Sequence, residues 1–194
     1  MSLSETDVRE IVRRVLEHIL AKSGAPGDRP FFAGESVTPA TSPERTVALG
    51  SDHGGYALKE QLKAYLAELG WQVADCGCHS PDPVDYPDFA YAVARQVSEG
   101  RAACGIVVDG AGIGSCMAAN KVPGVRAALC YALSTAINSR EHNDANVLTL
   151  GAGLIGPNLA KQIVKTWLET PFAGGRHERR VNKIMDIEGR FLKR

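Results

Sequence analysis

The sequence predicts an α/β fold in which helices cover both faces of a five-stranded parallel sheet. Two features of the chain predict it. From Thr46 onward, short apolar runs of strand length alternate with longer segments whose apolar residues recur every three or four positions. Glycine and proline residues separate these segments and mark the turns. Because strands that alternate with helices form parallel sheets, we expect a three-layer, Rossmann-like sandwich.

The predicted elements follow one another in a regular order. Strands are predicted at 46–50, 71–75, 106–108, 125–130 and 145–150, and helices at 58–69, 88–98, 115–121, 132–141 and 156–169, with a last helix after Gly174-Gly175. Right-handed crossovers bring the carboxyl ends of the first, third and fifth strands to one edge of the sheet. That edge is where open α/β sheets bind their ligands.

The first 45 residues differ from the rest of the chain. Residues 4–22 place apolar side chains on one helical face, whereas residues 23–45 are rich in Ser, Gly, Pro and Thr. We predict an amphipathic helix within 1–22, a flexible linker at 23–45 and a folded domain at 46–194. The helix either packs on its own domain or a copy of it, or docks to another protein. With its linker it resembles the encapsulation peptides of bacterial microcompartment cargo, which implies a shell protein as partner.

Composition excludes several classes of function. Lys and Arg together number 22, as do Asp and Glu, so bulk attraction to nucleic acid or anionic lipid is not expected. No apolar run approaches the ~18 residues of a membrane span. Five scattered cysteines indicate a reducing, cytoplasmic environment. Cys76-Gly77-Cys78-His79 has no second ligand pair, so we predict no metal site there.

A glycine-rich turn follows the third strand. Asp109 ends that strand, and Gly110, Gly112 and Gly114 follow it at the start of the next helix. Free backbone amides and a helix start favour an anion. We therefore hypothesise that Asp109 is a catalytic base and that the amides after it hold a developing negative charge. The alternative is an ordinary tight turn. The spacing matches neither the P-loop nor the full dinucleotide fingerprint, so no nucleotide cofactor is predicted.

Other candidate side chains are predicted near the same edge. The pairs Asp52-His53 and His142-Asn143 are expected at or just past strand carboxyl ends, beside Asp109. Histidine transfers protons near neutral pH, although each histidine alone also fits a structural role. Arg176 and Arg180 share one face of the last helix, near its amino end, where an anion such as a phosphate would offset their charge. This set of groups suits proton transfer next to a carbonyl on a small sugar phosphate.

Longer motifs resemble a known family. They are Gly50-Ser51-Asp52-His53-Gly54-Gly55, Asp85-Tyr86-Pro87-Asp88-Phe89, Ala118 to Ala127, Arg140 to Val147, and Gly174-Gly175-Arg176-His177. In these motifs and their order, residues 46–191 resemble the ribose-5-phosphate isomerase B family, which includes the galactose-6-phosphate isomerase subunits. The resemblance implies an aldose–ketose phosphate isomerase without metal or cofactor. It also implies a homodimer, or a tetramer, whose sites draw on two subunits.

The resemblance also implies roles for single residues. Asp52 and His53 would contact the sugar and assist ring opening, Tyr86 would line the sugar, and Gly110, Ala111, Gly112 and Gly114 would form the enediolate hole. His142, helped by Asn143, would open the furanose ring, and Arg176 and Arg180 would hold the phosphate.

Three positions depart from the family pattern. The usual cysteine base is Asp109 here, the usual threonine two residues later is Ala111, and an arginine often found after the fifth strand is Gly153. Cys116 lies nearby but ranks below Asp109 as the base. We therefore predict an isomerase of ribose 5-phosphate and ribulose 5-phosphate with Asp109 as base. The alternatives are an isomerase of another, six-carbon aldose phosphate and a non-catalytic sugar-phosphate-binding protein.

Overall fold

The computed structural model describes residues 45–191. The helix predicted at 4–22 lies outside the described residues, as does the linker predicted at 23–45 except for its last residue. Strands alternate with helices up to α6, and a last helix follows it: β1 (Thr46–Ser51), α2 (Tyr56–Glu68), β2 (Gln72–Asp75), α3 (Tyr86–Ser98), β3 (Cys104–Asp109), α4 (Ile113–Ala119), β4 (Ala127–Leu129), α5 (Leu133–Glu141), β5 (Val147–Gly151), α6 (Pro157–Glu169) and α7 (Arg176–Phe191). Among these residues, no helix is both long enough and apolar enough to cross a membrane.

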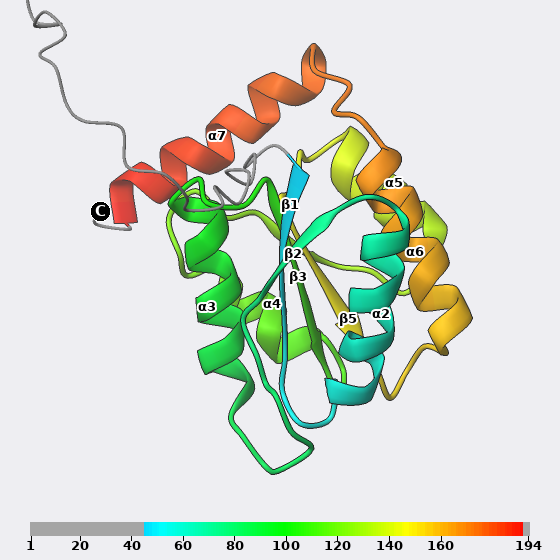
Figure 1. The fold of residues 1–194 in the computed structure, drawn as a ribbon. Coiled ribbons are helices and arrows are strands. Elements are labelled where there is room, and N and C mark those ends of the chain that lie inside the picture. Colours follow the sequence, from blue (N-terminus) through cyan, green and yellow to red (C-terminus); the bar gives the residue numbers. More distant parts are fainter. Residues whose placement is uncertain (1–44, 192–194) are drawn as a thin grey trace, which may run out of the picture. The chain divides into compact units, whose positions relative to one another are not determined.

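The five strands form one parallel sheet in the order β2-β1-β3-β5-β4, which confirms the predicted fold class. Helices α3 and α4 lie on one side of the sheet, and α2, α5 and α6 on the other (Figure 1). Neighbouring residues of β1 divide between the two cores: Val47 and Leu49 pack with α2 and α6, whereas Ala48 packs with α3. Both faces of the central strands are thus buried, as a parallel sheet requires.

Helices α2, α3 and α4 each begin two residues earlier than the sequence pattern predicts. Helix α3 starts at Tyr86 rather than Asp88, because Pro87 fits the first turn of a helix, where its missing N–H is not needed. Helix α4 starts at Ile113, directly after Gly112, whose φ of 77° is a left-handed conformation. Gly114 therefore lies inside the helix, although glycine is a poor helix former.

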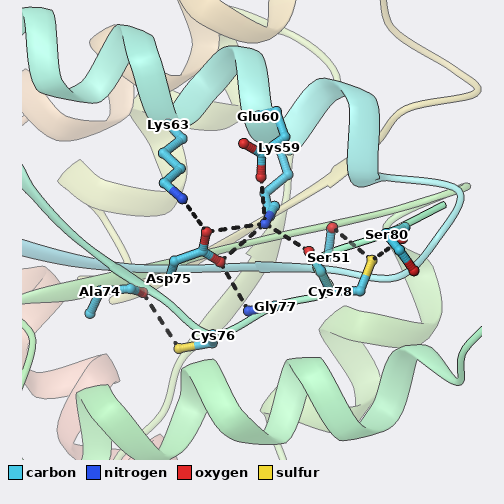
Figure 2. Close-up of polar contacts among 10 residues, drawn as sticks. All are labelled: Ser51, Lys59, Glu60, Lys63, Ala74, Asp75, Cys76, Gly77, Cys78 and Ser80. Carbon is cyan, nitrogen blue, oxygen red and sulfur yellow. Dashed lines mark hydrogen bonds and ion pairs between the residues drawn. The ribbon is translucent and has the colours of Figure 1, made fainter.

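A buried lysine fastens α2 to the segment that continues the sheet beyond β2. The side chain of Lys59 is fully buried, and its ammonium group contacts both carboxylate oxygens of Asp75, at 3.1 and 3.3 Å, and the Cys78 carbonyl, at 2.8 Å. Glu60 Oε1 lies 2.8 Å from the same nitrogen (Figure 2). Lys63 reaches Asp75 from the exposed side, at 2.5 Å.

The cations and the Gly77 N–H keep Asp75 ionised. Burial alone would raise the pKa of Asp75, but hydrogen bonds from Lys63, Gly77 and Lys59 outweigh it and lower this pKa to about 2. The network continues to the end of β1, because the Cys78 N–H donates to the Ser51 carbonyl at 2.8 Å. Lys59 therefore supports the strand end that carries Asp52.

Replacing Lys59 tests how much this network stabilises the domain. Lys59→Met removes the only described cation that contacts both Asp75 and the Cys78 carbonyl, so we expect the free energy of unfolding to fall by about 3 kcal/mol. Lys63→Met is the matched control, since Lys63 contacts the same carboxylate from an exposed position, and we expect a loss below about 1 kcal/mol. Urea unfolding measures both. If both variants lost the same free energy of unfolding, the buried Lys59 contacts would stabilise the domain no more than the exposed Lys63 contact.

Candidate active site

The carboxyl edge of the sheet carries Asp52 and His53. Asp52 is buried, and its Oδ1 accepts a hydrogen bond from the Gly55 N–H at 2.9 Å, just before α2 begins. His53 is exposed, and its Nδ1 lies 3.1 Å from both the nitrogen and the carbonyl oxygen of Val84. The backbone before α3 is thereby attached to the end of β1, which brings Tyr86 to the same edge.

The carboxylate of Asp109 lies inside the ring of backbone amides that follows it. Oδ1 accepts hydrogen bonds from the N–H groups of Ala111, at 2.8 Å, and of Gly112. Oδ2 accepts one from the Ser115 N–H at 3.0 Å, and the residue is only 4% exposed. Two of the amides expected to hold a bound intermediate, those of Ala111 and Gly112, thus donate to the protein's own carboxylate.

Two amides of the glycine loop remain available. Within the described residues, the N–H groups of Gly110 and Gly114 have no hydrogen-bond partner. Asp109 Oδ2 accepts a single hydrogen bond, whereas a carboxylate oxygen has two lone pairs. The loop thus retains two donors and one unused acceptor position at the end of β3.

Two tyrosines lie against the glycine loop. A Cβ atom at Gly114 would be 2.5 Å from the Tyr86 ring, so glycine is required for this close approach. The Tyr131 hydroxyl donates to the Ala111 carbonyl at 2.7 Å. Sequence reasoning missed Tyr131. Its position directly after the fourth predicted strand is the signal that would have found it, because strand carboxyl ends gather at this edge.

The end of β5 closes the other side of the loop. The Ala152 N–H donates to the Asp109 carbonyl at 2.8 Å, and the Gly153 N–H donates to the Gly110 carbonyl at 2.9 Å. A Cβ atom at Gly151 would lie 2.6 Å from the Ala111 carbonyl oxygen, which excludes any side chain there. At Gly153, a Cβ would lie 3.0 Å from the Gly110 carbonyl oxygen, so this position also allows a side chain only at the cost of a tight backbone contact.

The His142-Asn143 pair lies at the opposite edge. The pair follows α5 and precedes β5, which runs parallel to β3 in a register that pairs Gly105 with Val147 and Asp109 with Gly151. Strands of this length separate the two edges by about 13 Å. The prediction that these residues lie at a strand carboxyl end beside Asp109 is therefore wrong, because they stand at the amino end.

Asn138 orients both residues of that pair. Its Nδ2 lies 2.8 Å from His142 Nδ1, and its Oδ1 accepts from Asn143 Nδ2 at 3.3 Å. Sequence reasoning missed Asn138, although its spacing of one helical turn from His142 places both on one face of α5.

Helix α7 completes the amino-edge group. His177 stacks on His142 with ring centroids 4.1 Å apart and an interplanar angle of 1°. Arg176 Nε lies 3.3 Å from His177 Nε2, and Arg180 follows one turn later on the same helix. Helix α7 lies beyond the amino ends of the strands, at the top of Figure 1, whereas the loop from β1 to α2 is at the bottom.

The predicted site residues therefore form two half-sites. We call them the carboxyl half-site, with Asp52, His53, Tyr86, Asp109, Gly110, Ala111, Gly112 and Gly114, and the amino half-site, with His142, Asn143, Arg176 and Arg180. Each contains part of the chemistry expected of the whole. A single domain does not bring them together.

Burial disfavours the thiolate form of several cysteines. Burial raises the pKa of Cys116, whose Sγ lies 3.4 Å from the Ala127 carbonyl, so it is a poor substitute for the base. Burial likewise raises the pKa of Cys76 to about 11 and that of Cys104 to about 12. In residues 45–191, no three His, Cys, Asp or Glu side chains are grouped so that they would hold a metal ion.

Comparison with known proteins places this architecture in one family. The sequence profile of the Ribose/Galactose Isomerase family matches residues 47–184. The chain belongs to the Ribose/Galactose Isomerase family. One relative in it is ribose-5-phosphate isomerase B of Escherichia coli (strain K12), 44% identical over 146 residues, which are 75% of this chain and 98% of the relative.

Other members show how closely the fold and sequence agree. The structure of Clostridium thermocellum ribose-5-phosphate isomerase B superposes with a TM-score of 0.74 at 50% identity, and covers 75% of this chain and 99% of its own. D-erythrulose-4-phosphate isomerase of Pectobacterium atrosepticum is 41% identical over 143 residues, covering 72% of this chain and 92% of the relative. The family thus includes members named for sugar phosphates of different length.

Proposed function

We propose that the chain is an aldose–ketose isomerase that interconverts ribose 5-phosphate and ribulose 5-phosphate through an enediolate. The observation that carries the proposal is the loop after β3, where the carboxylate of Asp109 lies next to the free N–H groups of Gly110 and Gly114. A base beside preorganised donors is what enolisation requires. The 44% identity to an E. coli ribose-5-phosphate isomerase B supports the choice of substrate.

The proposed reaction uses each half-site for a separate step. Arg176 and Arg180 hold the phosphate, and His142 gives a proton to the ring oxygen as the furanose opens. Asp109 Oδ2 then removes the proton from C2. The electron pair of the broken C–H bond forms the C1–C2 double bond, and the charge gathers on the oxygen facing Gly110 and Gly114. A proton then moves from the C2 hydroxyl to the C1 oxygen, and the return of the first proton to C1 leaves the carbonyl at C2, which completes the isomerisation.

A complete site requires two chains in this proposal, which makes the enzyme a homodimer. The half-sites stand at opposite edges of one sheet, so a partner must bring its amino half-site to the carboxyl half-site. Apolar side chains that suit such a contact are exposed on α7, namely Ile184, Ile187 and Phe191. They border a cavity of about 510 Å³ between α7 and β4. We propose that the partner chain fills it.

A coupled assay with ribose 5-phosphate tests the proposal. Turnover is expected with this aldose phosphate, and a panel of four-carbon and six-carbon aldose phosphates ranks the alternatives. Gly153 has no side chain where the family often has an arginine, which leaves room for a different sugar. A clear preference for an aldose phosphate with another number of carbons would change the assigned substrate but not the type of reaction.

The burial of Asp109 favours a second candidate function. A carboxylate that is 4% exposed and already accepts three N–H bonds also fits a structural role in a sugar-phosphate-binding protein without turnover. Absence of turnover with the whole panel, together with retained binding of a sugar phosphate, would support this function over the first.

We also propose that residues 4–22 direct the enzyme from the cytoplasm into a bacterial microcompartment by binding a shell protein. The support is the amphipathic pattern followed by the Pro/Gly/Ser-rich stretch. Deletion of residues 1–45 is expected to abolish co-assembly with shell proteins and to leave isomerase activity in place. Unchanged co-assembly would exclude the proposal.

A further inference from the structure

The stacked histidines of the amino half-site form a unit with a defined hydrogen pattern. His142 ends α5 and is partly exposed, whereas His177, in the first turn of α7, is only 8% exposed. Arg176 Nε–H can only donate, so His177 Nε2, 3.3 Å away, accepts with its lone pair. His177 is therefore neutral, with its proton on Nδ1.

The neighbouring ring has the complementary pattern. Asn138 Oδ1 accepts from Asn143, so Asn138 Nδ2 donates to His142 Nδ1 at 2.8 Å. The proton of a neutral His142 then resides on Nε2, which lies 3.9 Å from Glu141 Oε1. Nε2 is thus the atom from which His142 donates, and Nδ1 accepts as long as the ring is neutral.

The charges around His177 oppose its protonation. Burial, followed by the charges of His142, Arg176 and Arg180, lowers the pKa of His177, and only Glu141 acts in the opposite direction. Two protonated rings at 4.1 Å would also repel each other. An anion bound to Arg176 and Arg180 would cancel two of the opposing charges at once.

We propose that His177 is a positioning residue that couples the anion on Arg176 and Arg180 to protonation of the His142–His177 pair. Binding of a phosphate dianion lets the pair take one proton from solvent at His142 Nδ1, in place of the hydrogen bond from Asn138, so that His142 remains a neutral imidazole after Nε2 gives up its proton. When the sugar ring opens, the bond from C1 to the ring oxygen breaks, its electron pair goes to that oxygen, and His142 Nε2 supplies the proton. The C1 hydroxyl loses its proton to solvent and becomes the carbonyl oxygen. The inference rests on the proposed phosphate site.

Sulfate is a suitable probe because it remains a dianion over the pH range of histidine titration. We expect sulfate to bind at least about fivefold more tightly at pH about 5.5 than at pH about 8. Calorimetry in buffers of different ionisation enthalpy should detect net proton uptake on binding near neutral pH. Nuclear magnetic resonance of the ring carbons should show the pair becoming protonated as sulfate is added.

His177→Phe keeps a stacked ring but removes the titrating nitrogens. In this variant we expect most of the proton uptake to disappear and the pH dependence of the sulfate Kd to fall, while sulfate still binds at pH about 8. His79→Phe, at the other edge, is the matched control and should leave both unchanged. If His177 only filled space, His177→Phe would change neither the proton uptake nor the pH dependence of the sulfate Kd.

The outcomes separate this inference from the proposed function. Equal sulfate affinity at both pH values, or full proton uptake by His177→Phe, would overturn the coupling while isomerase activity stood. Absence of sulfate binding at either pH would remove the phosphate site and the coupling with it. If His177→Phe does not fold, the resonance titration of the unaltered protein decides, because ring signals that ignore sulfate also overturn the coupling.

Discussion

Asp109→Asn is expected to lower kcat with ribose 5-phosphate by about a thousandfold or more, since it removes the only carboxylate at the end of β3. An asparagine oxygen at this position still accepts from Ala111 and Gly112. Its amide nitrogen then faces the Ser115 N–H, and neither group can accept a proton from C2. The coupled assay measures the loss, and sulfate binding to Arg176 and Arg180 should persist because they belong to the other half-site.

Two controls separate the loss of the base from a loss of stability. Asp109→Cys restores the residue usual in the family and should retain measurable turnover, although three N–H groups lose a full acceptor. Thermal unfolding of both variants reports the loss of those hydrogen bonds, which we expect to be about 1–3 kcal/mol. Near-normal turnover by Asp109→Asn would exclude Asp109 as the base, whatever its effect on stability.

Mixing two inactive variants should restore activity if each site is shared between chains. Asp109→Asn damages only the carboxyl half-site, and His142→Gln damages only the amino half-site. After random exchange of subunits, half of the dimers are mixed, and each has one site free of substitutions. The mixture should therefore recover about a quarter of the unaltered activity, far above either variant alone.

A second mixture provides the matched control. Asp109→Asn combined with Asp52→Asn places both substitutions in the carboxyl half-site, so every site of a mixed dimer remains damaged and no recovery is expected. Recovery in this control would mean that the two aspartates act in different sites. Failure of the first mixture, with subunit exchange confirmed by mass spectrometry, would contradict the shared site.

The sequence pattern was sufficient to predict the strands of the sheet. It did not predict that the site residues lie at two opposite edges of that sheet. Alternating periodicity located every strand, and the crossover rule placed β1, β3 and β5 together, because these depend on local pattern and chain handedness. His142 was assigned to the wrong edge because its position before β5 was treated like a position after a strand. The direction of the strand, not proximity to it, decides the edge.

The direction in which side chains point was the second feature that the sequence did not predict. Nothing in the spacing of Asp109 distinguishes a carboxylate that faces a ligand from one that turns back into its own loop. That choice depends on the left-handed Gly112 and on the contacts of the loop with the end of β5. Tyr131 and His177 were similarly missed as partners, since their contacts join residues 20 and 35 positions apart.

The turn of Asp109 into its loop has a consequence for ligand recognition. The Asp109 carboxylate accepts hydrogen bonds from the backbone at the amino end of α4, where a bound anion would otherwise lie. The segment from 109 to 115 therefore needs no ligand to keep its conformation. The entropy of ordering this segment is lost during folding and not when a ligand arrives, which favours a rigid rather than an adaptive recognition surface. Selectivity among sugars would then follow from fixed shape, with little room for induced accommodation.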